Sequence, residues 1–194
     1  MKVALINKPT LEFVDSAIGK CWGKGSYGAD TQKGAERIDR VCNKRKHGSM
    51  LRFVHYIFDM QISTSVLLEL SRHQAGVDLA MQSTRYTVHN SHLEIDYSGD
   101  YDVDIFLDKQ AEEARDFIYD HKNLSNDSLK LILPQAYLYN GQVQFNAQSL
   151  QHFFAMRAVK GAHPHIRQFA HLLYASLPED HKFLFDASLF EEQA

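Results

Sequence analysis

The stretch "SRHQAGVDLAMQSTRYT" (71–87) places two arginines, a histidine, two glutamines and several hydroxyl groups directly after the apolar run "SVLLEL" (65–70). We predict a helix over 63–73, a loop around Gly76 over 74–82 and a strand over 83–89. On a strand, Ser83 and Arg85 point to one face. A hydroxyl beside a guanidinium is typical of a site that binds an anion such as phosphate. A surface loop with ordinary ion pairs has the same pattern and is the more common case.

The remainder of the chain predicts a helix-rich α+β domain. Strands are predicted at 2–7, 50–62 and 136–145, the last with a hairpin at Asn140-Gly141 as an alternative. Without repeats or a linker, residues 1–194 are expected to form a single domain around a small mixed or antiparallel sheet. Further helices are predicted at 10–22, 30–48, 102–120, 125–132, 146–162, 165–177 and 179–190.

Composition excludes several classes of protein. A hydrophobic fraction of 44% and a charged fraction of 23% indicate a globular chain. The net charge of −3 gives no field that attracts nucleic acid. No apolar run is long enough to cross a membrane and no signal peptide is present, so we expect a cytoplasmic protein. Its two cysteines, Cys21 and Cys42, are expected to be reduced, with Cys21 packed on the apolar face of a helix.

Other polar residues have two interpretations each. Arg157 lies among aromatic and apolar residues of a predicted helix, so it either extends to solvent or meets an anion. Lys130 is a further candidate cation, and its ordinary interpretation is a solvated surface side chain. His163, His165 and His171 lack the spacing of metal ligands, so no metal is expected. No nucleophile motif occurs, and the residues alone therefore indicate an anion site without naming a reaction.

"RHQ" (72–74) followed by "STRY" (83–86) resembles the Arg-His-Arg…Ser-x-Arg-Tyr motif of flavin-dependent thymidylate synthases. The likeness extends in order over nearly the whole chain. It includes "AIGKCW" (17–22), "HGSMLRFVHYIF" (47–58), "LKLILP" (129–134), "NAQSLQHFFAMR" (146–157) and "FLFDASL" (183–189).

The resemblance implies a reaction and its partners. Members of this family methylate dUMP to dTMP, with methylenetetrahydrofolate as carbon donor, reduced FAD as hydride donor and NADPH as reductant of the flavin. They use no protein nucleophile, which agrees with the lack of a nucleophile motif here. They are homotetramers whose active sites lie between subunits.

The resemblance also assigns roles to individual positions. Arg157 and Ser83 correspond to catalytic positions. Positions that bind dUMP correspond to Arg72, Gln82, Ser83, Thr84, Arg85, Lys130 and Arg157. Positions on the flavin side correspond to His47, Ser49, His73, Gln74, Asn146 and His152.

This chain departs from the family pattern mainly on the flavin side. The family has charged or histidine residues where this chain has Phe53, Gln74, Gln148 and Gly161, and the stretch between "RH" and "STRY" is one residue longer. Two lost guanidinium groups weaken the binding of a pyrophosphate, and Arg52 is a candidate to restore one charge.

Two alternatives to this function remain. One is a divergent relative that binds a pyrimidine nucleotide and performs a different C5 modification or has lost catalysis. The other is an interaction domain without a small ligand.

Overall fold

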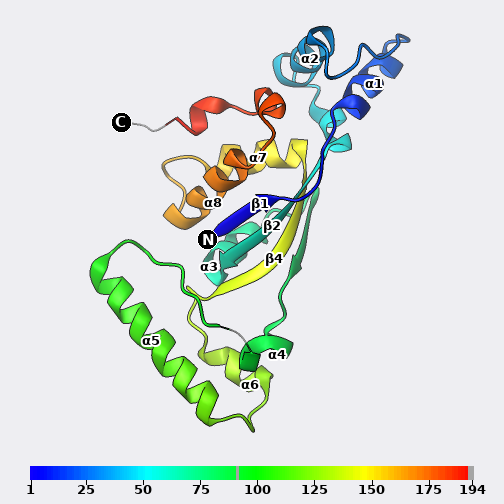
Figure 1. Cartoon of the computed structure of the whole chain (residues 1–194). Helices are drawn as coiled ribbons and strands as arrows, with labels where there is room; N and C mark the ends of the chain where they lie inside the picture. Colours follow the sequence, from blue (N-terminus) through cyan, green and yellow to red (C-terminus); the bar gives the residue numbers. More distant parts are fainter. Residues whose placement is uncertain (91, 192–194) are drawn as a thin grey trace.

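A four-stranded antiparallel sheet forms the centre of the computed structural model, which describes residues 1–90 and 92–191 (Figure 1). The spatial order of its strands is β1-β2-β4-β3. The strands are β1 (Lys2–Leu5), β2 (His55–Ser63), β3 (Val77–Met81) and β4 (Leu138–Asn146). The sheet is antiparallel throughout, so the α+β class expected from the sequence is present.

Helices and short helical turns surround the sheet. The helices are α1 (Glu12–Cys21), α2 (Gln32–Ile38), α3 (Thr64–Leu70), α4 (Thr84–Thr87), α5 (Tyr101–Asp120), α6 (Asn126–Leu129), α7 (Ala147–Arg157) and α8 (Pro164–Ala175). A π-helical turn (Asp39–Lys44) continues α2. Turns of 3₁₀ helix occur at Gly48–Phe53, Val88–Asn90, Lys130–Ile132, Glu179–Leu184 and Ala187–Leu189.

The main core lies between the sheet and the helices α7 and α8, which cover one of its faces (Figure 1). Alternate residues of β2 and β4 point into it, so Tyr56 and Phe58 are fully buried. Phe153 of α7 is the centre of an aromatic cluster, with its ring 5.3 Å from Phe145 and 6.1 Å from Phe169. Each such ring contributes about 1.5–3 kcal/mol through burial.

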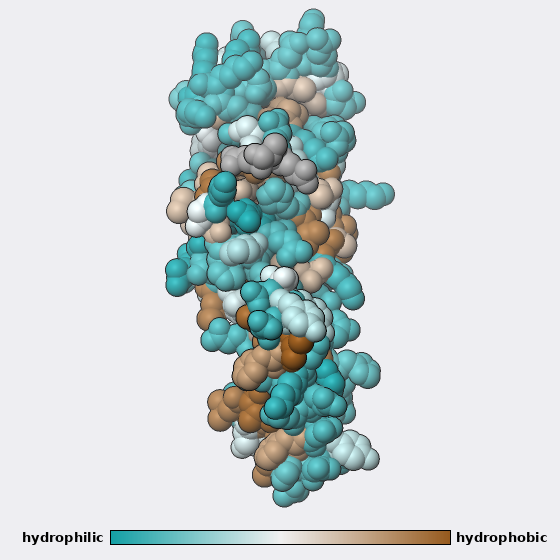
Figure 2. Space-filling view, turned by 90° about the vertical axis from the view of Figure 1, so that its left-hand side faces the viewer, coloured by the Kyte–Doolittle hydropathy of each residue, from teal (hydrophilic) through white to brown (hydrophobic). Residues whose placement is uncertain are grey.

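A smaller core lies at the far end of the sheet, beneath α5. It contains Val88, Leu93, Ala114, Ile118, Leu129 and Tyr137. The long helix α5 projects from the body of the molecule (Figure 1). Apolar side chains of α5, among them Val103, Ile105 and Phe106, stay exposed. Figure 2 shows brown, apolar patches in the lower half of the face that it presents.

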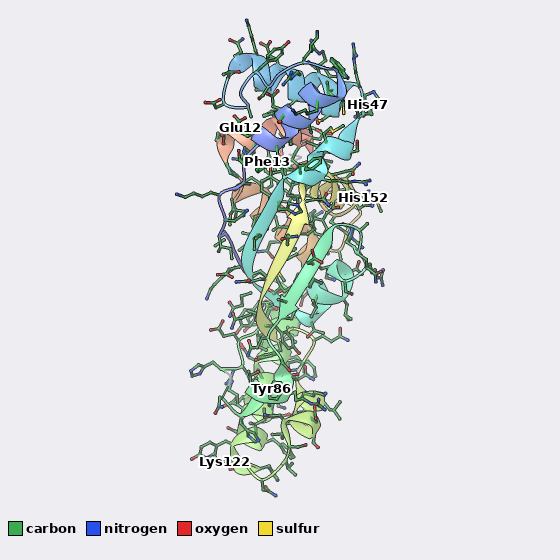
Figure 3. The ribbon with its side chains drawn as sticks, turned by 90° about the vertical axis from the view of Figure 1, so that its right-hand side faces the viewer. Glu12, Phe13, His47, Tyr86, Lys122 and His152 are labelled. Carbon is green, nitrogen blue, oxygen red and sulfur yellow. The ribbon has the colours of Figure 1, made fainter. Side chains whose placement is uncertain are left out.

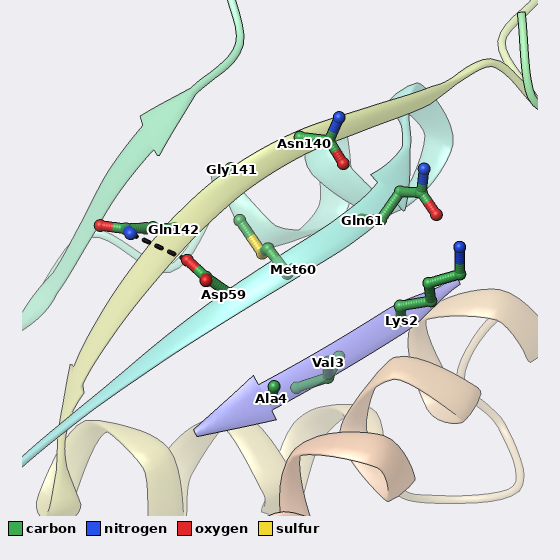
Figure 4. A pocket seen from close by; sticks show the side chains of 9 residues that line it. All are labelled: Lys2, Val3, Ala4, Asp59, Met60, Gln61, Asn140, Gly141 and Gln142. Atoms are coloured by element: carbon green, nitrogen blue, oxygen red, sulfur yellow. Dashed lines mark hydrogen bonds between the residues drawn. The ribbon is translucent and has the colours of Figure 1, made fainter. Parts of the chain in front are cut away.

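The other face of the sheet is polar. Lys2, Asp59, Gln61 and Gln142 project from it and line an open pocket of about 520 Å³ (Figure 4). The side-chain amide of Gln142 donates a hydrogen bond of 2.8 Å to Asp59, across the β2–β4 pair. One apolar and one polar face are the usual pattern for an antiparallel sheet covered on one side.

Two of the elements predicted around the opening stretch are wrong. The predicted loop 74–82 contains β3, which pairs with β4 and alternates Val77 and Leu79 with Asp78. The predicted strand 83–89 is a helical turn, because Thr87 donates a hydrogen bond to the backbone carbonyl of Ser83 and closes the turn locally. Consequently, Ser83 and Arg85 do not share a strand face.

Other differences concern element limits and packing. Asn140 and Gly141 continue β4 without a hairpin, because they pair with Gln61 and Met60 of β2. A Cβ on Gly141 would collide with Met81 and the carbonyl of Ala80, so glycine suits this position. Cys21 is exposed rather than packed, whereas Cys42 is buried. Three predicted elements are shorter in the structure. The helix predicted over 30–48 is limited to α2 and its π-helical turn, the strand predicted over 50–62 to β2, and the helix predicted over 146–162 to α7. None of the described helices has the length and apolar character needed to cross a bilayer.

A buried hydrogen bond connects the sheet to the C-terminal turns. The Tyr56 hydroxyl lies 2.9 Å from Nδ1 of His181, and both side chains are buried. Burial lowers the pKa of His181, so the neutral ring is favoured in the folded chain. The stability that neutral, buried His181 contributes is therefore fully present above about pH 6.5, the pKa of this histidine in the unfolded chain. It is lost as the pH falls through the lower pKa of His181 in the folded chain.

We expect Tyr56→Phe to lower the free energy of unfolding by about 1–3 kcal/mol above neutral pH, because it leaves Nδ1 of His181 buried without a partner. Urea denaturation measures this difference. Tyr101→Phe removes an exposed hydroxyl and is the matched control, expected to stay within about 0.5 kcal/mol of wild type. Equal stability of the two variants would contradict the role of this hydrogen bond.

Candidate functional site

The end of β4 brings the turn before β3 against the start of α7. Asn146 caps α7, and its side-chain oxygen accepts a hydrogen bond of 2.9 Å from the backbone N–H of Ser149. The backbone N–H of Asn146 donates to the carbonyl of Gly76 at 3.0 Å. Gly76 has φ of +70°, and a Cβ there would collide with the side chains of Asn146 and Ser149. Glycine is therefore required at this point.

This turn, α7 and Arg52 enclose a pocket of about 600 Å³. The lining residues are Arg52, His73, Gln74, Ala75, Gly76, Val77, Asn146, Gln148, Ser149 and His152. Four of the six residues assigned to the flavin side by sequence thus line one pocket. The other two, His47 and Ser49, are exposed beside it and flank Gly48, which packs against the Gln148 side chain. Figure 3 shows His47 and His152 at the same end of the sheet.

Arg157 is held by two side chains at the edge of this pocket. Its Nε donates to Nε2 of His73 at 2.9 Å, and its NH1 lies 2.6 Å from Glu69. The acceptor role of Nε2 requires an uncharged His73 ring. Burial is the main cause that lowers the pKa of His73, and the charges of Arg157 and His152 lower it further. The sequence left two interpretations of Arg157, extension to solvent or contact with an anion. In the structure Arg157 contacts an anion, the carboxylate of Glu69.

Arg72 belongs to the same group of charges. It lies 3.7 Å from Glu69, and 70% of its side-chain surface is exposed. A long, exposed ion pair of this kind contributes little to stability and leaves the guanidinium able to exchange partners.

Two of the remaining predicted site residues form a second group around Asp127. Arg85 and Lys130 each lie 3.0 Å from a carboxylate oxygen of Asp127. The hydrogen bond from Lys130, and then that from Arg85, lowers the pKa of Asp127. Gln82 bonds to the backbone of Asn140, so it fixes the end of β3 against β4. In the same segment Ser83 is exposed at the start of α4, and Thr84 is half-buried.

The two groups lie at opposite ends of β3. At about 3.3 Å per residue, the strand alone separates them by roughly 13 Å. Figure 3 shows His152 and Tyr86 toward opposite ends of the sheet. The structure therefore does not bring Arg72 together with Ser83 and Arg85 in one copy of the chain.

Sequence reasoning missed Glu69 and Asp127, the two carboxylates that hold the candidate cations. Each precedes one of its partners by three residues, Arg72 and Lys130 respectively, and this spacing on a helix is a recognisable signal. Arg85 and Arg157 reach the same carboxylates from distant parts of the chain, which no local pattern reveals. Among the described residues, no three His, Cys, Asp or Glu side chains form a group that could hold a metal ion.

Fold and site together define a nucleotide-modifying enzyme family. Residues 10–181 match the family described as thymidylate synthase complementing protein. The chain belongs to this family, that of the flavin-dependent thymidylate synthases, and is an enzyme of this kind. The family, the fold class and the kind of enzyme expected from the sequence are thus confirmed.

Individual relatives are similar over their whole length. The flavin-dependent thymidylate synthase of Campylobacter jejuni is 33% identical over 210 aligned positions, which cover 99% of each chain. That of Wolinella succinogenes is 34% identical over 203 positions, covering 95% of this chain and 97% of its own. The crystal structure of thymidylate synthase X from Helicobacter pylori with FAD and dUMP has a TM-score of 0.89. It is 26% identical and covers 99% of this chain and 100% of its own.

We expect Arg157→Met to raise the pKa of His73, because the substitution removes a nearby positive charge and leaves the negative charge of Glu69. NMR titration of the histidine ring protons measures this pKa. Arg72→Met is the matched control, since Arg72 also pairs with Glu69 but does not bond to His73. A His73 pKa that moves equally in both variants, or falls in Arg157→Met, would contradict the assignment.

Proposed function

We propose that this chain, acting as a single domain over residues 1–194 in the cytoplasm, methylates dUMP to dTMP on bound FAD. Methylenetetrahydrofolate supplies the carbon and NADPH reduces the flavin. The similarity over the full length to a thymidylate synthase crystallised with FAD and dUMP carries this proposal.

The pocket beside α7 fits a flavin nucleotide. Its described lining offers one guanidinium, from Arg52, together with amide and hydroxyl groups, two histidines and no carboxylate. Phosphates favour such surroundings, because no fixed negative charge opposes them. In this proposal the residues on the flavin side are His47, Ser49, His73, Gln74, Asn146 and His152.

The nucleotide substrate binds to the two groups of cations. Each carboxylate orients two cations, so each group keeps an excess of positive charge for an incoming phosphate. The residues proposed to bind dUMP are Arg72, Gln82, Ser83, Thr84, Arg85, Lys130 and Arg157.

Two residues are proposed to act on the reacting pyrimidine. Arg157 stabilises the negative charge that develops on the ring, and Ser83 contributes a hydroxyl to the same substrate. Reduced FAD supplies a hydride when it is bound. Neither Cys21 nor Cys42 lines the pocket, which agrees with chemistry that uses no protein nucleophile.

A complete site takes residues from more than one copy of the chain. The length of β3 separates Arg72 and Arg157 from Arg85 and Lys130, so one small nucleotide does not reach both groups within a single copy. A homotetramer with sites between subunits joins the two ends.

We expect the purified protein to bind FAD, to show a flavin absorption band and to restore growth of a thymidine-requiring host.

We also expect Arg85→Ala to weaken dUMP binding by about tenfold or more, because a charge-assisted contact to phosphate is lost. Isothermal titration measures the dUMP affinity, with Lys109→Ala on the exposed part of α5 as the control. Lack of FAD binding would refute the proposed reaction, and equal dUMP affinity in Arg85→Ala would refute the placement of the phosphate.

Mixing two inactive variants tests whether a site is shared between subunits. We expect Arg85→Ala and Arg157→Ala each to lose most activity, and co-assembled mixtures to regain up to about a quarter of the wild-type rate. That fraction follows from random assembly of equal amounts of the two variants. About one site in four then takes its intact Arg85 from one subunit and its intact Arg157 from the other. Each variant assembled alone is the control. Activity that stays absent in the hybrids, with co-assembly verified by affinity tags, would place both arginines in one subunit's site.

A further inference from the structure

Arg52 is the single lysine or arginine among the described residues that line the pocket beside α7. It lies in the 3₁₀ turn Gly48–Phe53 and is exposed. The other candidate cations lie outside this lining, and each is paired with Glu69 or Asp127. Arg52 therefore supplies the guanidinium that faces this pocket.

Gln148 orients the guanidinium of Arg52. Nε of Arg52 donates a hydrogen bond of 2.6 Å to Oε1 of Gln148, from the 3₁₀ turn to the first turn of α7. The amide of Gln148 packs closely on Gly48, since a Cβ built there would lie 3.2 Å from Nε2. Only Nε is used in this contact, so the two terminal nitrogens, NH1 and NH2, are left for an anion.

No carboxylate competes for Arg52. None of the described lining residues is Asp or Glu, and no ion pair involves Arg52 in the described part of the chain. The neighbouring His73 adds no charge, because its Nε2 accepts a hydrogen bond from Arg157. An exposed guanidinium fixed at Nε and lacking a counter-ion suits bidentate binding of a phosphate.

We propose that Arg52, positioned by Gln148, binds the pyrophosphate of the flavin dinucleotide in this pocket. This inference rests on the proposed function, which supplies FAD as the ligand. It assigns the anion-binding role to the 3₁₀ turn rather than to the turn after α3, where Gln74 is uncharged.

Titration of FAD into the apoprotein, followed by quenching of flavin fluorescence, tests the assignment. We expect Arg52→Gln to raise the Kd for FAD by about tenfold or more, and Arg52→Lys to have a smaller effect because it keeps the charge but loses the bidentate geometry. Arg40→Gln is the matched control, since Arg40 is also exposed but does not line the pocket. The Kd of wild type should also rise more steeply with salt than that of Arg52→Gln.

Moving the guanidinium across the contact gives a second test. Because residues 52 and 148 touch, the double variant Arg52→Gln/Gln148→Arg returns a guanidinium to nearly the same place. We expect it to recover most of the FAD affinity that Arg52→Gln loses. Thermal denaturation of each variant verifies that it is folded, and this exposed pair should leave the melting temperature close to that of wild type.

The inference is wrong if wild type binds FAD and Arg52→Gln binds it equally well, or if both show the same salt dependence. It is also wrong if the double variant binds as weakly as Arg52→Gln alone. Failure of wild type to bind FAD at all would instead refute the proposed function, and the inference with it.

Discussion

The antiparallel pairing of β2 with β4 is the constraint on which the rest of the structure depends. Nine consecutive residue pairs, from His55 with Asn146 to Ser63 with Leu138, fix the two strands in one register. A shift by one residue would turn Tyr56 and its buried neighbours to the polar face. The same pairing determines where α3 and α7 begin. It also presents β4 to β3, whose length separates the two groups of candidate cations.

Both groups are built alike, with a carboxylate that holds two cations before any ligand binds. Glu69 holds Arg72 and Arg157, and Asp127 holds Arg85 and Lys130. The exposed pairs of Arg72 and Arg85 contribute little to folding, so their value lies in orienting the charges. Arg52 differs because a neutral amide orients it, which leaves its full charge to the pocket.

Elements with strong periodicity or caps were predictable, and those determined by pairing were not. The helix 102–120 and the helices that begin near 146 and 165 have apolar faces, and each has a residue that accepts its N-terminal hydrogen bonds. β3 was missed because Gly76 dominates the local pattern, although the short strand 77–81 forms by pairing with β4. The turn 84–87 was missed because its hydrogen bond from Thr87 to Ser83 outweighs the strand propensity of "TRYTV".

The sequence by itself determined the family and the fold class, because the motif residues and their order survive in the chain. Only the tertiary structure decided how those residues are grouped. It separated Arg85 from Arg72 by the length of a strand, paired Arg157 with Glu69 and His73, and placed Arg52 against Gln148. Contacts between residues far apart in the chain follow from strand register and helix packing, which a local pattern does not encode.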